Sequence, residues 1–243
     1  MDWSKRYLQQ ARWTAQLRHY LFNKAGLSVA GRCLDVGCGT GAVMQDIPDG
    51  CMRHGVDIHF PSLSHAVQAV PGAHLVAADG IHLPYDNQVF DITYCHFVLL
   101  WVRDPLQVLL EMSRVTRVGG AVLALAEPDY GGRIDYPEEL AQVGLWQTQS
   151  LRGQGADPQM GRKLAALFNQ VGLRQVEAGV LGGEWRKGVQ NDDFDLEWQV
   201  LEEDFGGRIS HSELGAMSRL DAGARSRGER ILYVPTFYAW GVV

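Results

Sequence analysis

Three glycines at alternate positions, Gly37, Gly39 and Gly41, constrain the fold of this chain more than any other feature. They follow a short apolar run, residues 32–36, that is typical of a buried β-strand. Because glycine has no Cβ atom, the backbone can turn sharply at these positions and a ligand can approach it closely. We expect residues 40–47 to form a helix whose unpaired N–H groups point at that ligand. The pattern therefore predicts a site for a nucleotide-like molecule.

Apolar runs alternate with helix-like segments along much of the chain. We expect strands at residues 32–36, 52–57, 73–79, 90–97, 121–127 and 173–180, with a β-rich end at 231–240. We expect helices at residues 4–22, 40–47, 61–70, 105–118, 157–171, 194–203 and 210–227, and loops between 127 and 155. Pro105 after Asp104 marks a helix start, and Ser210 with Glu213 fits a capping box. This alternation predicts an α/β fold with a mostly parallel sheet and helices on both faces.

Composition narrows the class of protein. Hydrophobic residues make up 46% of the 243 residues and charged residues 21%, which is typical of a globular protein and argues against disorder. The net charge is −6 and no basic block is present, so we expect no nucleic-acid partner. The sequence contains no run of about 18 apolar residues, so we expect no membrane span. The four cysteines form no C-x-x-C pair, and we interpret them as reduced thiols of a cytoplasmic protein.

The glycine loop by itself leaves the ligand open. Gly37, Gly39 and Ala42 also satisfy the pattern of dinucleotide-binding loops. Asp57 lies 20 residues after Gly37, at the end of the second expected strand, where an acid can accept hydrogen bonds from both ribose hydroxyls. NAD, FAD and S-adenosylmethionine all contain that ribose.

Further motifs favour one ligand. The run from Leu34 to Gly41 and the acid Asp57 resemble the motifs of class I S-adenosylmethionine-dependent methyltransferases, of the ubiquinone/menaquinone-biosynthesis type that acts on small molecules. The other matching elements are Asp79-Gly80 with Leu83-Pro84, Phe90-Asp91, and Arg114 before Gly119-Gly120. The resemblance covers about residues 32–125. It implies a Rossmann-like sheet of seven strands, the last antiparallel, and a helical substrate cap.

The resemblance also implies a domain organisation and a set of cofactor-binding residues. We expect one domain, residues 1–243, with its core at about 26–180 and 231–243 and cap elements at about 1–24, 130–156 and 182–230. In this family the loop N–H groups bind the methionine carboxylate, the residue matched by Asp35 binds the ammonium, and that matched by Asp79 binds the adenine amino group. The cofactor-binding residues that we predict are Asp35, Gly37, Cys38, Gly39, Gly41, Asp57, Ile58, Asp79, Gly80 and His96.

Catalysis would need few side chains, because the sulfonium already activates its methyl group and the enzyme mainly aligns a nucleophile with it. The predicted reaction is direct displacement, with S-adenosylhomocysteine as product. His96 ends the fourth expected strand and is the candidate general base, although it could equally cap the strand or contact the cofactor. Tyr130 is a candidate proton relay. Asp129 and Arg133 could bind a polar substrate group, or belong to a loop closing over the cofactor.

Aromatic residues gather outside the motif region. Tyr7, Trp13, Trp146 and Trp185 are candidates for an aromatic substrate wall, although packing within a cap explains each of them as well. The eight histidines show no H-x-x-x-H spacing, and we expect no metal. Two alternatives to a methyltransferase are an NAD(P)-dependent oxidoreductase and a non-catalytic nucleotide-binding homologue. The acceptor atom and the choice between monomer and homodimer stay open.

Overall fold

The computed structural model describes residues 3–183 and 194–243, and the chain divides into two compact units. The sheet unit comprises Asp2–Glu127, Met160–Leu181 and Thr236–Val243. The insertion unit comprises Pro128–Gln159 and Gly182–Pro235. The expectation of one domain with a cap stays a prediction.

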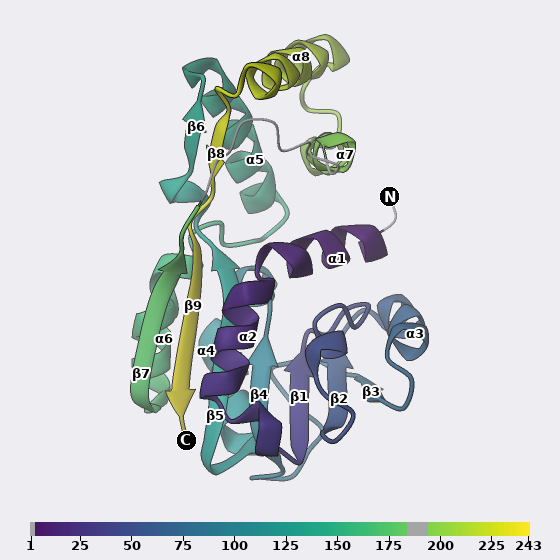
Figure 1. The fold of residues 1–243 in the computed structure, drawn as a ribbon, viewed down its shortest axis with the longest axis vertical. Helices are drawn as coiled ribbons and strands as arrows, with labels where there is room; N and C mark the ends of the chain where they lie inside the picture. The colour runs from purple at the N-terminus through teal and green to yellow at the C-terminus, as the bar shows by residue number, and fades with distance from the viewer. Residues whose placement is uncertain (1–2, 184–193) are drawn as a thin grey trace. The chain divides into compact units, whose positions relative to one another are not determined.

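The sheet unit is built on seven strands in the order β3-β2-β1-β4-β5-β9-β7 (Figure 1). Their bounds are β1 Arg32–Val36, β2 Met52–Asp57, β3 His74–Ala77, β4 Phe90–Cys95, β5 Thr116–Pro128, β7 Arg174–Leu181 and β9 Thr236–Val242. The strands β3, β2, β1, β4 and β5 pair in parallel, and β9 pairs antiparallel with β7. The α/β prediction with a seven-stranded, mostly parallel sheet and an antiparallel last strand is confirmed.

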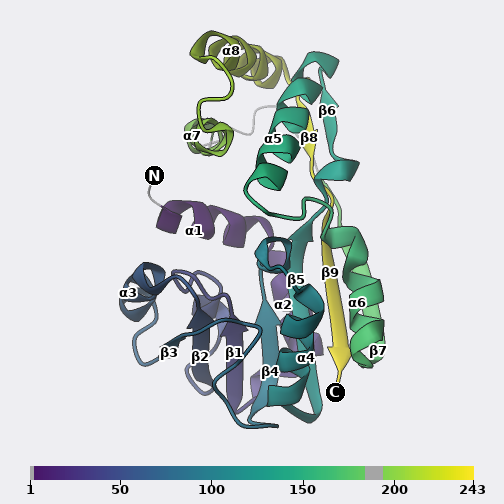
Figure 2. The same cartoon turned by 180° about the vertical axis from the view of Figure 1, so that it is seen from behind.

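Helices cover both faces of this sheet. The helices are α1 Trp3–Trp13, α2 Ala15–Lys24, α3 Phe60–Ala69, α4 Pro105–Val115 and α6 Leu164–Val171. Helix α2 lies over one face (Figure 1), and α4 and α6 lie over the other (Figure 2). Beneath α4 and α6 the strands present fully buried apolar side chains such as Leu34, Val36 and Val122, and beneath α2 they present Ile92, Tyr94 and Leu123. Burial on both faces explains why these strands are apolar runs without alternation.

The expected helix after the glycine loop is wrong. Residues 40–47 contain only a 3-10 turn at Met44–Asp46. Gly39 and Gly41 have positive φ angles of +51° and +79°. Because a right-handed helix needs negative φ angles, a helix cannot start at residues 40 and 41. Ile47 is extended (ψ 126°) before Pro48, which disfavours the helical conformation in the preceding residue. The loop therefore lacks the helix N-terminus that the sequence predicts.

Other element boundaries need correction. The predicted helix 4–22 is two helices, which meet at Thr14 (φ −107°, ψ 5°). Helix α4 ends at Val115 and not at the glycine pair, because Thr116 is extended and begins β5. Helix α6 begins at Leu164 and not near residue 157, although the left-handed Gly172 ends it as expected.

In its described residues, the insertion unit holds an antiparallel pair of strands and three α-helices. These are β6 Ile134–Tyr136, β8 Ile231–Tyr233, α5 Ala141–Gly153, α7 Phe194–Phe205 and α8 His211–Arg227. Helix α5 lies in the stretch expected to be loops. Pro128, Gly131, Gly132 and Pro137 all precede the helix, and Val143 packs in one apolar cluster with Phe205 and Leu214. The capping box of Ser210 and Glu213 is confirmed. Among the described residues no helix is both long and apolar enough to cross a membrane.

Candidate cofactor-binding and active site

The glycine loop leaves β1 and turns back toward β2. Gly37 and Cys38 both donate their N–H groups to the Val56 carbonyl, at 2.7 and 3.0 Å. Gly37 has a φ of +75°, and a Cβ atom added there would lie 2.4 Å from a methyl group of Val98. The turn therefore requires glycine at position 37 for its backbone angle and also for space.

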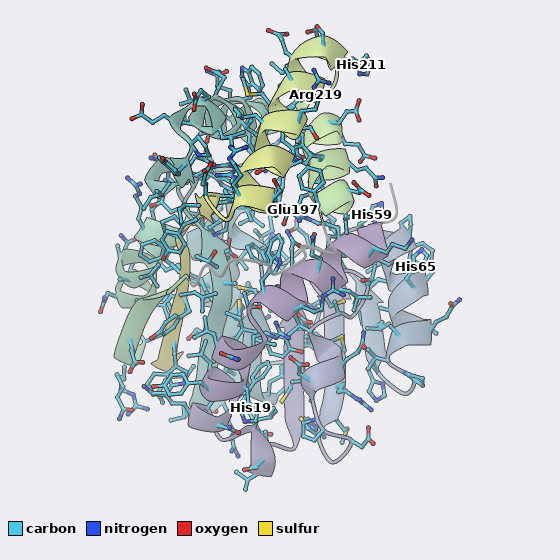
Figure 3. All side chains as sticks on the ribbon, turned by 45° about the horizontal axis from the view of Figure 1, so that its top comes forward. His19, His59, His65, Glu197, His211 and Arg219 are labelled. Carbon is cyan, nitrogen blue, oxygen red and sulfur yellow. The ribbon has the colours of Figure 1, made fainter. Side chains whose placement is uncertain are left out.

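Asp57 closes the loop from the end of β2. Its Oδ2 accepts a hydrogen bond from the Gly39 N–H at 2.7 Å, and its Oδ1 accepts one from the His59 N–H at 2.8 Å. Figure 3 shows His59 where the chain enters α3. Each carboxylate oxygen has a second lone pair, so the contacts with the loop leave Asp57 able to accept from ribose hydroxyls. The glycine loop and Asp57, which we predict to share one site, are thus joined by a hydrogen bond.

Asp35 lies beneath the same loop. It is 2% exposed, and in the sheet register it stands opposite Tyr94, whose hydroxyl hydrogen-bonds to its carboxylate. Burial, and then the nearby charge of Asp57, raise the pKa of Asp35 well above its ordinary value. Within the described part of the chain, no lysine, arginine or histidine forms an ion pair with it. A buried carboxylate that has no ion-pair partner in the protein fits a site that receives a ligand ammonium.

Tyr7 reaches the loop from α1. Its ring lies against Gly39, since a Cβ atom added to that glycine would come within 3.2 Å of the tyrosine Cε2. Burial and the charge of Asp57 raise the pKa of Tyr7. Helix α1 passes across the C-terminal ends of β1 and β2 (Figures 1 and 2). Tyr7, predicted as a substrate residue, therefore belongs beside the cofactor loop.

The remaining predicted cofactor residues differ in what they present. Ile58 is 74% exposed at the end of β2, and Asp79 is exposed after β3, where its Oδ1 accepts from the Ile81 N–H at 3.1 Å. The Cys38 side chain is buried in a cluster with Met44, so only its backbone faces the loop. Burial raises the pKa of the Cys38 thiol. All four cysteines are free and buried, as expected.

His96 follows β4 and is held by the N-terminal helices. Its Nε2 lies 2.8 Å from the hydroxyl of Thr14, and Arg18 Nη1 donates to that hydroxyl at 2.6 Å. Arg18 is 2% exposed and pairs with Asp46 at 2.6 Å. Burial, and then the charge of Arg18, lower the pKa of His96 to about 3. The imidazole is therefore neutral at physiological pH, but a pKa so far below that pH makes it a weak proton acceptor, which weakens the case for His96 as a general base.

Glu127, at the C-terminal end of β5, escaped the sequence-based prediction. Its carboxylate is fully buried and accepts from the backbone N–H groups of Val98, Leu99 and Leu100 at 2.9, 2.8 and 3.1 Å. Burial raises its pKa to about 7, although the three N–H donors oppose that rise. Glu127 thus fixes the segment that packs on Gly37 and follows His96. The only signal in the sequence was an acid ending an apolar run.

Several predicted substrate residues have structural roles. Trp13 is 45% exposed, with the Arg6 guanidinium 4.8 Å from its ring centre. In the insertion unit, the Asp129 carboxylate accepts from the Gly131 N–H at 3.0 Å, and the Tyr130 N–H donates to the Pro158 carbonyl.

Arg133 and Trp146 are also engaged within the insertion unit. The Arg133 guanidinium is buried between Asp135, at 2.6 Å, and Gln147, at 2.7 Å, so its charge is already paired. Trp146 stacks edge-on against Phe205 with ring centres 6.0 Å apart, and both line a small pocket with Arg208. Trp185 lies outside the described residues. Within the described ranges, no group of three His, Cys, Asp or Glu residues is placed to hold a metal ion.

Comparisons with known proteins identify the family that the motif region resembles. Residues 34–124 match a family model described as a methyltransferase domain. A demethylmenaquinone methyltransferase from Roseiflexus castenholzii is 39% identical over 101 residues, which are 39% of this chain and 42% of that protein. A malonyl-[acyl-carrier protein] O-methyltransferase from Pseudescherichia vulneris is 32% identical over 117 residues, covering 48% and 47%. The chain thus spans less than half the length of either relative.

A solved structure shares the fold over nearly the whole chain. An N-methyltransferase from Haemonchus contortus, solved with phosphomonomethylethanolamine and S-adenosylhomocysteine, superposes with a TM-score of 0.61 at 14% identity. The match covers 97% of this chain and 56% of that one. The resemblance that the motifs indicate is confirmed. Residues 34–124 of this chain therefore form a methyltransferase domain, set in a sheet whose fold S-adenosylmethionine-dependent methyltransferases share.

Proposed function

We propose that the chain transfers a methyl group from S-adenosylmethionine to a small-molecule acceptor by direct displacement. The observation that carries the proposal is Asp35: a carboxylate buried under the glycine loop, inside the matched segment, that forms no ion pair with a lysine, arginine or histidine among the described residues. An aminoacyl-type ligand supplies that cation, whereas a dinucleotide does not. The oxidoreductase alternative has no comparable support.

Each contact with the donor is assigned to a residue by its chemistry. Backbone N–H groups of the loop at 37–41 would bind the methionine carboxylate, and Asp35 would accept from the ammonium. Asp57 would accept from the ribose hydroxyls, and Asp79 with Gly80 would meet the adenine edge. The bound donor supplies a methyl group activated by the sulfonium. The chain's own task is to orient the acceptor and keep water away, and Tyr7 against Gly39 suits the second role.

The acceptor is proposed to be a small molecule in the cytoplasm. The names of the two relatives, the net charge of −6 and the four free cysteines support this assignment. Trp13, Trp146 and Trp185 each stay proposed aromatic contacts of the substrate, and Asp129 and Tyr130 stay proposed polar contacts. Arg133 is the weakest member of the proposed set, because Asp135 already neutralises it.

A turnover screen tests the proposal. The protein is incubated with methyl-deuterated S-adenosylmethionine and pooled metabolites, and mass spectrometry follows S-adenosylhomocysteine and any deuteromethylated product. Acceptor-dependent turnover that Asp35→Asn abolishes is expected, while Asp49→Asn, at an exposed acid of the same unit, leaves it unchanged. Binding of S-adenosylhomocysteine without turnover on any pool would instead favour the non-catalytic homologue.

A further inference from the structure

His96 is fixed by a chain of side chains that starts at a buried arginine. Arg18, on α2, donates through Nε and Nη2 to Asp46 Oδ2 at 2.8 and 2.6 Å. Its Nη1 donates to Thr14 Oγ1 at 2.6 Å and also to the Ala11 carbonyl. Thr14 Oγ1 then lies 2.8 Å from His96 Nε2. Thr14 and Arg18 lie one turn apart at the start of α2, whereas Asp46 and His96 come from two other segments of the sheet unit, and nothing in the sequence links the three segments.

The proton positions in this chain follow from counting donors. Arginine only donates, so Thr14 Oγ1 must accept from Arg18 and has one proton left to give. The carbonyls of Gln10 and Ala11 lie 3.4 Å away, at the outer limit of a hydrogen bond, whereas His96 Nε2 lies at 2.8 Å. The Thr14 hydroxyl therefore donates to Nε2. An imidazole that accepts at Nε2 carries its proton on Nδ1 when it is neutral.

The free face of the ring is the Nδ1 side. Among the described residues, His96 Nδ1 has no hydrogen-bond partner. It is also not one of the fully buried polar atoms that lack a partner, so solvent or a ligand can reach it. The Phe97 ring packs edge-on against the imidazole with ring centres 4.6 Å apart. The charged group that acts on His96 is Arg18, from α2, with its partner Asp46 from the turn at 44–46. A nearby cation disfavours the imidazolium, in agreement with the lowered pKa.

Resting on the function proposed above, we propose that His96 contacts the methyl acceptor as a neutral hydrogen-bond donor through Nδ1, held in that tautomer by Thr14 and Arg18. The matching substrate presents an oxygen that accepts this hydrogen bond. It is also ionised before methyl transfer, as an acidic hydroxyl or a carboxylate is. An aliphatic alcohol does not meet this condition, because a proton would have to leave it and His96 Nε2 is already occupied.

The electron and proton balance of the step is simple. A lone pair on the ionised oxygen forms the new bond to the methyl carbon as the sulfur–carbon bond breaks. The pair of the broken bond stays on sulfur, which leaves a neutral thioether. No proton moves to or from His96 in this step. Thr14 and Arg18 touch neither reactant and are positioning residues.

Nuclear magnetic resonance tests the tautomer without any substrate. Long-range ¹H–¹⁵N correlation spectra of the labelled protein give the ¹⁵N shifts of both His96 nitrogens, assigned by their loss in His96→Gln. We expect Nδ1 protonated and Nε2 unprotonated from pH 8 down to pH 5. Thr14→Ser keeps the hydroxyl and should keep this pattern. Thr14→Val removes it and should populate the Nε2–H tautomer and raise the titration midpoint toward 6.5, the ordinary histidine pKa.

Two results would overturn the inference. The first is a wild-type spectrum that shows the proton on Nε2, or a wild-type His96 ring that titrates near pH 6.5. This test needs only the wild-type protein, so it stands even if Thr14→Val does not fold. The second is turnover of an aliphatic alcohol in the metabolite screen, with a rate midpoint near pH 6.5 that His96→Asn removes. Neither result touches the proposed function itself, which fails separately if the protein does not bind S-adenosylhomocysteine.

Discussion

At the scale of single residues, acids at strand ends have divergent roles that burial and donors decide. Asp35 is buried and forms no ion pair among the described residues. Asp57 accepts hydrogen bonds from two backbone N–H groups, and the buried Glu127 accepts them from three. Sequence spacing could predict the first two, because each follows an apolar run at a fixed distance from the glycine loop. It could not predict Glu127 or the link from Thr14 to His96, because their partners lie 27 to 29 and 82 residues away.

Replacing Asp57 by alanine tests its assignment to the ribose. Loss of charged hydrogen bonds should weaken S-adenosylhomocysteine binding by about 1.5–3 kcal/mol, roughly 10- to 150-fold in Kd. Isothermal titration calorimetry measures the change, with Asp49→Ala, at an exposed acid, as the matched control. An affinity equal to that of the wild type would refute the assignment.

Glu127 should give the fold a distinct pH dependence. Its pKa of about 7 in the folded protein exceeds the ordinary 4.5, so folding takes up a proton between these values. The stability that this group contributes is therefore present below pH 4.5 and is lost as the pH rises through 7, on the order of 3 kcal/mol in total.

Urea unfolding from pH 4.5 to 7.5 measures that contribution in the wild type and in Glu127→Gln. The glutamine cannot ionise, so the free energy of unfolding should fall less steeply with pH in the variant. Glu139→Gln makes the same chemical change at an exposed position and should leave the slope unchanged. Equal slopes in the wild type and Glu127→Gln would show that Glu127 has an ordinary pKa.

At the scale of elements, two motif residues, Asp91 and Arg114, hold strands and loops in place. Asp91 Oδ2 accepts from the N–H groups of Gly31 and Arg32 at 2.7 and 2.8 Å, and its Oδ1 pairs with Arg117. That acid thus ties the starts of β1 and β5 to β4. Arg114 likewise holds the loop at 83–87 through backbone carbonyls of Leu83 and Tyr85.

Element type was predictable where apolar periodicity is strong, and it was missed where local geometry decides. Strand–helix alternation predicted the sheet, since the central strands β1, β4 and β5 are buried on both faces. The helix expected at 40–47 fails because two positive-φ glycines and Pro48 bracket a segment of only six residues. Helix α5 was missed because its partners, Phe205 and Leu214, lie more than 50 residues away.

The glycine loop gives a prediction at this scale. Gly37→Ala should destabilise the fold by about 2–5 kcal/mol, since a left-handed residue costs about 1–2 kcal/mol and the overlap with Val98 adds about 1–3. Gly72→Ala has the same sign of φ, +81°, but no atom within 4 Å of the added methyl group. It should show the backbone cost alone in urea unfolding. Equal losses for both variants would mean that Val98 moves aside without cost.

At the scale of the whole molecule, the two units differ in how they are stabilised. The sheet unit has extensive apolar clusters on both faces of the sheet. The insertion unit combines one apolar cluster with buried ion pairs, in which Asp135 binds Arg133 and Arg230, and Arg230 also binds Asp221. Glu197 of α7, labelled in Figure 3, pairs with Arg225, which joins the network through its ion pair with Asp221. The motifs lie wholly in the sheet unit, so the sequence assigns specific residues to the donor site and only candidates to the acceptor site.

Binding of the donor's product tests the central claim most directly. Calorimetric titration of the wild-type protein with S-adenosylhomocysteine should give binding in the micromolar range, with one site per chain, and titration with NADH should give none. Asp35→Asn should lose much of this binding, because the amide cannot neutralise the ligand ammonium. Binding of NADH, with no heat from S-adenosylmethionine or S-adenosylhomocysteine, would contradict the account.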